Sequence, residues 1–238
     1  MRVLTFNTWG SYGPAARRPV LLQAIRALKA EILCLQEVVD RSLLKDLSYP
    51  TEIWAQTGGL AILSRLPLIT HLEITFKTCS PLESFPRQTL FVQLKHESLS
   101  LWVGTTHLAW KAEDEATRLA QVEELLDHAS RLPDPLLLSG DFNATPYSAP
   151  IRKIVGEGFL DLFVALHPDD SGITWDNRNP FIQSHSVIFP DRRIDYLFLR
   201  ESGKSLLPPI DCEVVCRTPM DEELYPSDHY GVLARLKL

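Results

Sequence analysis

The sequence lacks a long apolar segment and a cysteine framework, and each absence argues against a class of protein. No hydrophobic run approaches the roughly 18 residues that mark a membrane-spanning helix, and the N-terminal residues lack the apolar core of a signal peptide. The four cysteines, Cys34, Cys79, Cys212 and Cys216, lack the paired spacing of a zinc site. We therefore expect a soluble, cytoplasmic protein with reduced thiols and no stable membrane anchor.

The sequence also lacks a basic surplus. It holds 24 Lys and Arg against 30 Asp and Glu, a net charge of −6, and its basic pairs form no stripe or tail. Proteins that bind duplex nucleic acid usually carry a surplus of cations that displaces phosphate counterions. The charge balance therefore argues against a general duplex binder, although an uneven distribution of charge still allows a nucleic-acid substrate.

What the sequence does contain is enough apolar material for a core. Hydrophobic residues make up 45% of its 238 positions, and no shift in composition or low-complexity run marks a linker. We therefore predict one domain over residues 1–238.

Strand-like runs outnumber helical ones. The spacing of apolar residues predicts strands over residues 2–8, 32–38, 59–65, 68–76, 89–95, 99–108, 136–143, 193–200 and 229–238. It predicts helices only after Pro19 and over residues 113–131. Hairpin connections mixed with helical crossovers favour mixed sheets. We expect an α/β protein in which two mixed sheets pack together, with helices on their outer faces.

Polar residues recur at or near the ends of these apolar runs. They are Asn7, Gln36, Glu37, His107, Asp141, Asn143, Asp195, Asp228 and His229. Singly, each has a structural explanation: Gly-Asp-x-Asn forms turns, Glu37 suits an exposed edge, and His107 suits a hydrogen-bonded core. A buried carboxylate nevertheless costs several kcal/mol unless it is paired or bound to a metal. Their recurrence at strand ends therefore indicates a shared cleft.

Six segments in one order carry a resemblance to a known family. They are TFNTW, LQEV, GTTHL, SGDFN, RRIDYLF and SDHYGV. Together they resemble the endonuclease/exonuclease/phosphatase superfamily, a likeness that runs from residue 3 to residue 232. The resemblance implies a four-layer α/β sandwich, with a magnesium-dependent phosphodiesterase or phosphatase site at one edge of its sheets.

The resemblance also implies a metal site. Glu37 is its main ligand, since Mg²⁺ prefers hard oxygen donors, and Asn7 and Asp228 match positions that complete or adjoin it. Mn²⁺ is expected to substitute for Mg²⁺. Some nucleases of the family carry an acidic residue where this sequence has Trp9. We therefore expect one principal metal ion.

The remaining strand-end residues match positions that act on the phosphate. The resemblance implies that Asp141 orients or deprotonates the attacking water, that Asn143 holds a phosphate oxygen, and that His107 contacts the phosphate. It also implies that His229 donates a hydrogen bond to the phosphate while Asp195 fixes its tautomer. The alternative for Asp195 is an ion pair with Arg192 or Arg193.

A second set of residues is expected to bind substrate. Relatives place the region before RRIDYLF beside the cleft, and arginine binds phosphate with two hydrogen bonds. The set is Trp9, Arg87, Trp175, Asp176, Asn179 and Arg193. The alternatives are a core role for Trp9, an Asx-rich loop closed by Pro180, and solvated arginines.

The leading hypothesis is a metal-dependent hydrolase of a phosphoester, most simply a phosphodiester. A DNA repair nuclease, a sphingomyelinase-like lipase and an enzyme for a small phosphoester are its variants, and the acidic, compact chain favours the last. The alternative is an inactive binding module, which would be expected to lose Glu37, Asp141 or His229, whereas all three are present. The sequence leaves the oligomeric state open.

Overall fold

The computed structural model describes residues 1–57, 59–201, 207–220 and 224–237. Its strands form two six-stranded mixed sheets. The first sheet has the order β11 (Pro209–Val215), β12 (Gly231–Leu236), β1 (Arg2–Asn7), β2 (Ile32–Gln36), β4 (Ala61–Ser64) and β3 (Thr51–Trp54). The second has the order β5 (Leu68–Thr75), β6 (Gln88–His96), β7 (Leu99–His107), β8 (Leu136–Asp141), β10 (Asp195–Arg200) and β9 (Leu160–Asp161). Two pairs are parallel, β1–β2 and β7–β8.

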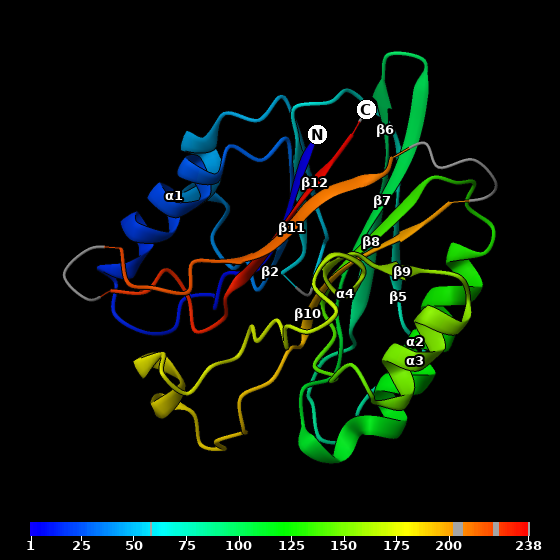
Figure 1. Cartoon of the computed structure of the whole chain (residues 1–238). Helices are drawn as coiled ribbons and strands as arrows, with labels where there is room; N and C mark the ends of the chain where they lie inside the picture. Colours follow the sequence, from blue (N-terminus) through cyan, green and yellow to red (C-terminus); the bar gives the residue numbers. More distant parts are fainter. Residues whose placement is uncertain (58, 202–206, 221–223, 238) are drawn as a thin grey trace.

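The three longest helices lie on the outer faces of the two sheets, which makes four layers (Figure 1). Helix α1 (Arg17–Leu28) packs on the first sheet, and α2 (Glu115–Ala129) and α3 (Ala149–Gly156) pack on the second. Shorter helices are α4 (Leu162–Leu166), η1 (Arg41–Leu47), η2 (Ala112–Asp114) and η3 (Pro180–Ser184). The expected α/β sandwich is confirmed.

Alternation along the strands separates the layers. In β1, Leu4 and Phe6 face α1, whereas Val3 belongs to the core between the sheets. Thr5 and Asn7 share the inward face with Val3, because successive side chains of a strand point to opposite sides. Gln36, at the end of β2, links the two sheets: its Nε2 donates to Oγ1 of Thr5 and, at 2.8 Å, to Oγ1 of Thr105. The inward rows of both sheets thus turn from apolar to polar toward one end.

The boundaries of several elements differ from the predicted ones. Helix α1 begins at Arg17, before Pro19, because a proline in the first turn does not interrupt a hydrogen bond that the helix needs. The predicted helix over 113–131 is a short η2 turn followed by α2. Edge strands β3 and β11 and the eight-residue α3 were not predicted, since short elements with one buried face carry little periodic signal.

Two further features concern the predicted environment. No helix among the described residues is long and apolar enough to cross a membrane. All four cysteines are free thiols, and the buried pair Cys34 and Cys212 belongs to the core between the sheets. Burial raises the pKa of both thiols to about 12, so they behave as small apolar side chains.

Candidate active site

Asn7 joins the two sheets at the polar end of the core. It ends β1 of the first sheet, is fully buried, and its Nδ2 donates to Oε1 of Glu37 at 3.1 Å. The same Nδ2 donates to Oδ2 of Asp141, at the end of β8 in the second sheet, at 3.0 Å. One amide therefore holds two carboxylates that lie 104 positions apart in the chain, a distance given by their residue numbers.

The backbone takes an unusual conformation at three of these strand ends. Trp9, Glu37 and Asn143 have φ values of 56°, 54° and 49°, in the left-handed region that side chains other than glycine rarely adopt. Gly59 packs on the Glu37 turn so closely that a Cβ there would lie 3.2 Å from the Cα of Glu37. Strain of this kind persists where the surrounding structure holds it, and it concentrates at functional sites.

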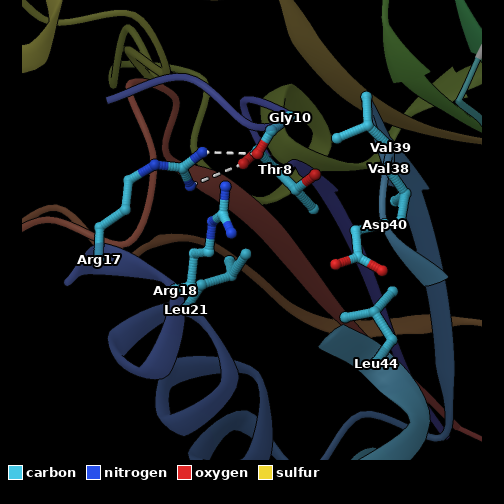
Figure 2. A pocket seen from close by; sticks show the side chains of 9 residues that line it. All are labelled: Thr8, Gly10, Arg17, Arg18, Leu21, Val38, Val39, Asp40 and Leu44. Atoms are coloured by element: carbon cyan, nitrogen blue, oxygen red, sulfur yellow. Dashed lines mark hydrogen bonds between the residues drawn. The ribbon is translucent and has the colours of Figure 1, made fainter. Parts of the chain in front are cut away.

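A buried arginine holds the loop that follows β1. Arg17 is fully buried, and its guanidinium donates to the carbonyls of Thr8, Trp9, Gly10, Tyr12 and Pro226 at 2.8–3.1 Å. Figure 2 shows Arg17 reaching from α1 toward the backbone at Thr8 and Gly10. Because Pro226 lies two residues before Asp228, this one side chain ties together two loops that carry site residues.

His229 and Asp195 form a buried hydrogen-bonded pair. Nδ1 of His229 lies 3.0 Å from Oδ2 of Asp195, and its Nε2 lies 3.7 Å from Oδ2 of Asp141. Burial alone lowers the pKa of His229, but the nearby carboxylates Asp195, Asp141 and Asp228 outweigh it and raise that pKa to about 10. Thr174 supports the pair, because its Oγ1 accepts a hydrogen bond from the backbone N of Asp195. The pair presents a protonated imidazole.

His107 is placed differently. It ends β7, and its Nε2 lies 3.4 Å from Oδ2 of Asp141 and 4.0 Å from Oε1 of Glu37. Burial, helped by the charges of Arg87 and His229, lowers the pKa of His107 well below its usual range. His107 and His229 thus both approach Oδ2 of Asp141, but their pKa values are shifted in opposite directions.

The carboxylates of the site exceed its cations. Burial and the charge of Asp228 raise the pKa of Glu37, and burial with the charge of Asp195 raises the pKa of Asp141 to about 7. Both shifts mean that a further positive charge would stabilise the site. Crowded oxygen donors with too little positive charge fit a divalent cation such as Mg²⁺.

Two parts of the site bear on where such a cation would bind. The ligand atoms of Asp141, Asp195 and His229 lie within 4.8 Å of one another. His229, however, already shares its Nδ1 with Asp195 and carries a proton on both nitrogens when charged, so it suits a hydrogen-bond donor better than a ligand. Glu37, whose side chain is 27% exposed, offers an accessible oxygen beside Asn7. We therefore favour the Glu37 side of the site.

An open cavity of about 920 Å³ lies over the site. Glu37, His107, Asp141, Asn143, Asp228 and His229 all line it, and so do the expected substrate-binding residues Trp9, Arg87 and Trp175. Arg87 is not free, however, because its guanidinium donates to both carboxylate oxygens of Glu83, at 2.6 and 2.9 Å.

Three of the expected substrate-binding residues lie elsewhere. Arg193 is buried, and its guanidinium pairs with Asp161 at 2.8 Å, which corrects its expected place at the phosphate. Asp176 accepts hydrogen bonds from Arg178 instead of facing the cavity. Asn179 caps η3, and its Nδ2 donates to the carbonyl of Ser227 at 2.8 Å. It therefore holds the loop that carries Asp228. In all three, the side chain is used within the loop or core.

Residues that motif analysis did not select also line the cavity. His185 is the most notable, because its Nε2 lies 2.9 Å from Oδ2 of Asp228. The other aromatic ones are Tyr12, Phe85, Trp110 and Phe181. They lie in loops and do not follow the strand-end pattern. In the sequence, their place in the cavity is indicated only by the presence of an aromatic residue near a motif.

Known proteins share this architecture. A crystal structure of TDP2 from Danio rerio, complexed with a single-strand DNA product, superposes with a TM-score of 0.84 and 21% identity, covering 100% of this chain and 99% of that one. The sequence is 31% identical to protein angel homolog 2 of Danio rerio over 177 residues, 61% of this chain and 30% of the relative. It is 26% identical to nocturnin of Rattus norvegicus over 254 residues, 91% of this chain and 57% of the relative. The chain thus spans less than two thirds of either relative's length.

The family assignment rests on the sequence as a whole. Residues 4–229 match the Endonuclease/Exonuclease/phosphatase family, which is nearly the entire chain. This range includes every strand-end residue described above, from Asn7 to His229. The chain therefore belongs to the endonuclease/exonuclease/phosphatase family.

Proposed function

We propose that the protein is a metal-dependent phosphoester hydrolase that cleaves a phosphodiester. The observation that carries this proposal is the cavity floor, where acidic, amide and imidazole groups from both sheets converge on Asp141. Phosphodiester hydrolysis needs a positioned water, neutralisation of the phosphoryl oxygens and help for the leaving group. The floor offers groups for the first two needs.

Glu37 is the proposed principal ligand for one Mg²⁺, with Asn7 and Asp228 completing or adjoining its site. Glu37 and Asp228 carry carboxylate oxygens for such an ion, whereas Asn7, whose Oδ1 accepts the backbone N–H of Trp9 at 2.9 Å, adjoins the site. Mn²⁺ is expected to replace Mg²⁺ because both ions prefer oxygen. A bound ion would neutralise charge on the phosphoryl oxygens. Asn7 Nδ2 keeps the Glu37 carboxylate oriented toward the cavity through its 3.1 Å hydrogen bond.

The residues around Asp141 have separate proposed roles. Asp141 accepts the proton of the attacking water. The backbone N–H of Asn143 holds the Asp141 carboxylate in place by donating to its Oδ1 at 2.9 Å. Asn143 and His107 line the cavity beside Asp141 and are the proposed contacts of the phosphate. Nδ2 of Asn143 donates one hydrogen to the carbonyl of Leu108 at 3.1 Å, so its second hydrogen is the one proposed for the phosphate. His229 donates a hydrogen bond from Nε2 to a phosphoryl oxygen, because Asp195 occupies its Nδ1.

A nucleic-acid substrate has specific support in the comparison with TDP2, whose structure holds a single-strand DNA product. A nuclease of the DNA repair type is therefore the second candidate. An inactive binding module is less well supported, since the catalytic groups are present and converge.

A substrate panel tests the function, with each member assayed in Mg²⁺, Mn²⁺ or EDTA. The panel holds abasic duplex DNA, single-stranded DNA, sphingomyelin, a nucleotide diphosphate derivative and bis(p-nitrophenyl) phosphate. Turnover of none of them despite measurable Mg²⁺ binding would favour the binding module.

Glu37→Gln is expected to weaken metal binding without unfolding the protein. The substitution removes the charge of the proposed ligand but keeps its shape and its contact with Asn7. We expect the Mn²⁺ concentration for half-maximal binding, measured by calorimetry, to rise by at least about 10-fold. Glu123→Gln, on the exposed face of α2, is the matched control. Unchanged Mn²⁺ affinity in Glu37→Gln would place the metal elsewhere, with the Asp141, Asp195 and His229 set as the next candidate.

His229→Ala is expected to lower kcat by at least about 10²-fold, the scale of a lost donor to the transition state. Asp195→Asn should lower kcat less, and the double variant should be no slower than His229→Ala, because residues acting as a unit are not additive. Steady-state kinetics on bis(p-nitrophenyl) phosphate measures all three, with exposed His71→Ala as the control. If the double variant lost kcat by the product of the two single losses, Asp195 and His229 would not act as a pair.

A further inference from the structure

A second histidine–aspartate pair lines the cavity, and the proposed chemistry does not use its histidine. Nε2 of His185 lies 2.9 Å from Oδ2 of Asp228, and both residues line the cavity. His229, which follows Asp228 in the chain, is paired with Asp195 instead. Two neighbouring residues before β12 are therefore each held by a different distant partner, one at the end of η3 and the other at the start of β10.

His185 is the main hydrogen-bond donor to the Asp228 carboxylate. Within the described part of the chain, the other donor is the hydroxyl of Ser227, whose Oγ lies 3.1 Å from Oδ1 of Asp228. That hydroxyl also lies 2.8 Å from the carbonyl oxygen of Asn7, and its single hydrogen serves one acceptor at a time. The side chain of Asp228 is only 3% exposed, so little solvent is available to replace a lost donor. The orientation of this buried carboxylate therefore depends on His185.

The imidazole of His185 is itself held in place by packing. Its ring lies edge-on to that of Trp175, with 5.0 Å between the centroids, and 5.9 Å from the ring of Trp9. The backbone N of His185 donates to the carbonyl of Ile182 and so ends the η3 turn. The same turn is anchored by Phe181, whose ring lies 4.9 Å from that of Trp9. A side chain fixed in this way can hold a partner in one orientation.

Asp228 lies beside the proposed metal ligand Glu37. After burial, the charge of Asp228 is the next cause that raises the pKa of Glu37, which places the two carboxylates near each other. A divalent cation bound there would relieve their repulsion. Carboxylates that bind a metal ion are themselves held by hydrogen bonds from neighbouring groups. His185 is in the position to give that support to Asp228.

We propose that His185 is a positioning residue for the metal site: from the end of η3, its imidazole holds the Asp228 carboxylate in the orientation that a bound divalent cation requires. This inference rests on the proposed function, because it takes Glu37 and Asp228 as the acidic side of the metal site. His185 acts through Asp228, with the hydrogen on Nε2 donated to Oδ2. The property that this role needs is the N–H donor and not the aromatic ring.

Calorimetric titration of Mn²⁺ into the metal-free protein tests the inference with two variants of one residue. His185→Phe keeps an aromatic ring beside Trp9 and Trp175 but removes the donor. His185→Gln removes the ring but keeps an N–H donor at the same number of bonds from the backbone. We expect the dissociation constant of Mn²⁺ to rise by about 10- to 100-fold in His185→Phe and to stay within about 3-fold of wild type in His185→Gln.

His167→Phe is the matched control for the change from imidazole to phenyl. His167 is also partly buried, its ring lies 5.1 Å from that of Phe163, and it does not line the cavity. Its replacement should leave the affinity for Mn²⁺ unchanged. Wild-type affinity in His185→Phe, or an equal loss of affinity in both His185 variants, would overturn the inference and leave the proposed function intact.

Kinetics at saturating Mn²⁺ separates positioning of the metal site from a part in the chemistry. The kcat of His185→Phe for bis(p-nitrophenyl) phosphate should then recover to within about 3-fold of wild type, since His229 remains paired with Asp195. A kcat that stayed low with the metal site filled would overturn the positioning role. If wild type itself bound no Mn²⁺, the proposed function would fail, and this inference with it.

Discussion

Asp141→Asn is expected to lower kcat for a phosphodiester by about 10²- to 10⁴-fold, the range for loss of a positioned general base. Asp141 lies where four groups converge, since Asn7, the backbone of Asn143, His107 and His229 all face its two oxygens. Asparagine keeps the shape but cannot take the proton of the attacking water. KM should change little, because Asp141 is proposed to contact the attacking water and other residues to contact the phosphate.

Steady-state kinetics with Mg²⁺ at saturation measures this effect, and far-UV circular dichroism checks that the variant is folded. The control is Asp127→Asn, which removes a carboxylate from the exposed surface of α2. Within the part of the chain that the structure describes, Asp127 pairs with Arg131 at the surface, with a side-chain exposure of 61%, so its loss should leave kcat unchanged. If Asp141→Asn retained more than a tenth of the wild-type kcat, Asp141 would not be the base.

Gly140→Ala is expected to destabilise the fold by about 3 kcal/mol or more, from steric overlap and an unfavourable backbone conformation together. Gly140 precedes Asp141 in β8 and has a φ of 140°, which L side chains rarely adopt. A Cβ at this position would lie 2.1 Å from the carbonyl oxygen of Thr106 in the neighbouring strand β7. The two strands would have to separate beside the catalytic floor.

Urea unfolding followed by circular dichroism measures the loss, and Gly156→Ala is its control. Gly156 ends α3, and a Cβ there would meet nothing within 4 Å. Its replacement should leave the free energy of unfolding unchanged or raise it by up to about 1 kcal/mol, because alanine restricts the unfolded chain. Equal unfolding midpoints for the two variants would mean that β8 adapts to the added methyl group.

Aligned strand-end motifs made the fold and the cavity floor predictable. Asn7, Glu37, Asp141 and His229 each follow or precede an apolar run, and the ends of paired strands meet at the same edge of a sheet. The pairing of Asp195 with His229 came from the family resemblance alone, because 34 residues separate them and no spacing rule joins them. The structure places their side chains 3.0 Å apart.

The family, the two-sheet architecture and the polar residues at the strand ends could thus be predicted from the sequence, because they depend on local periodicity and on motifs within a few positions. The use of the other charged and aromatic side chains depends on tertiary packing. Arg87 and Arg193 look alike in the sequence. Arg87 nevertheless lines the cavity while it donates to Glu83, whereas Arg193 pairs with Asp161 in the interior. Phe181 and Trp110, 71 positions apart by their residue numbers, line one cavity. Such contacts depend on how loops that are distant in the sequence pack together, so no local sequence pattern predicts them.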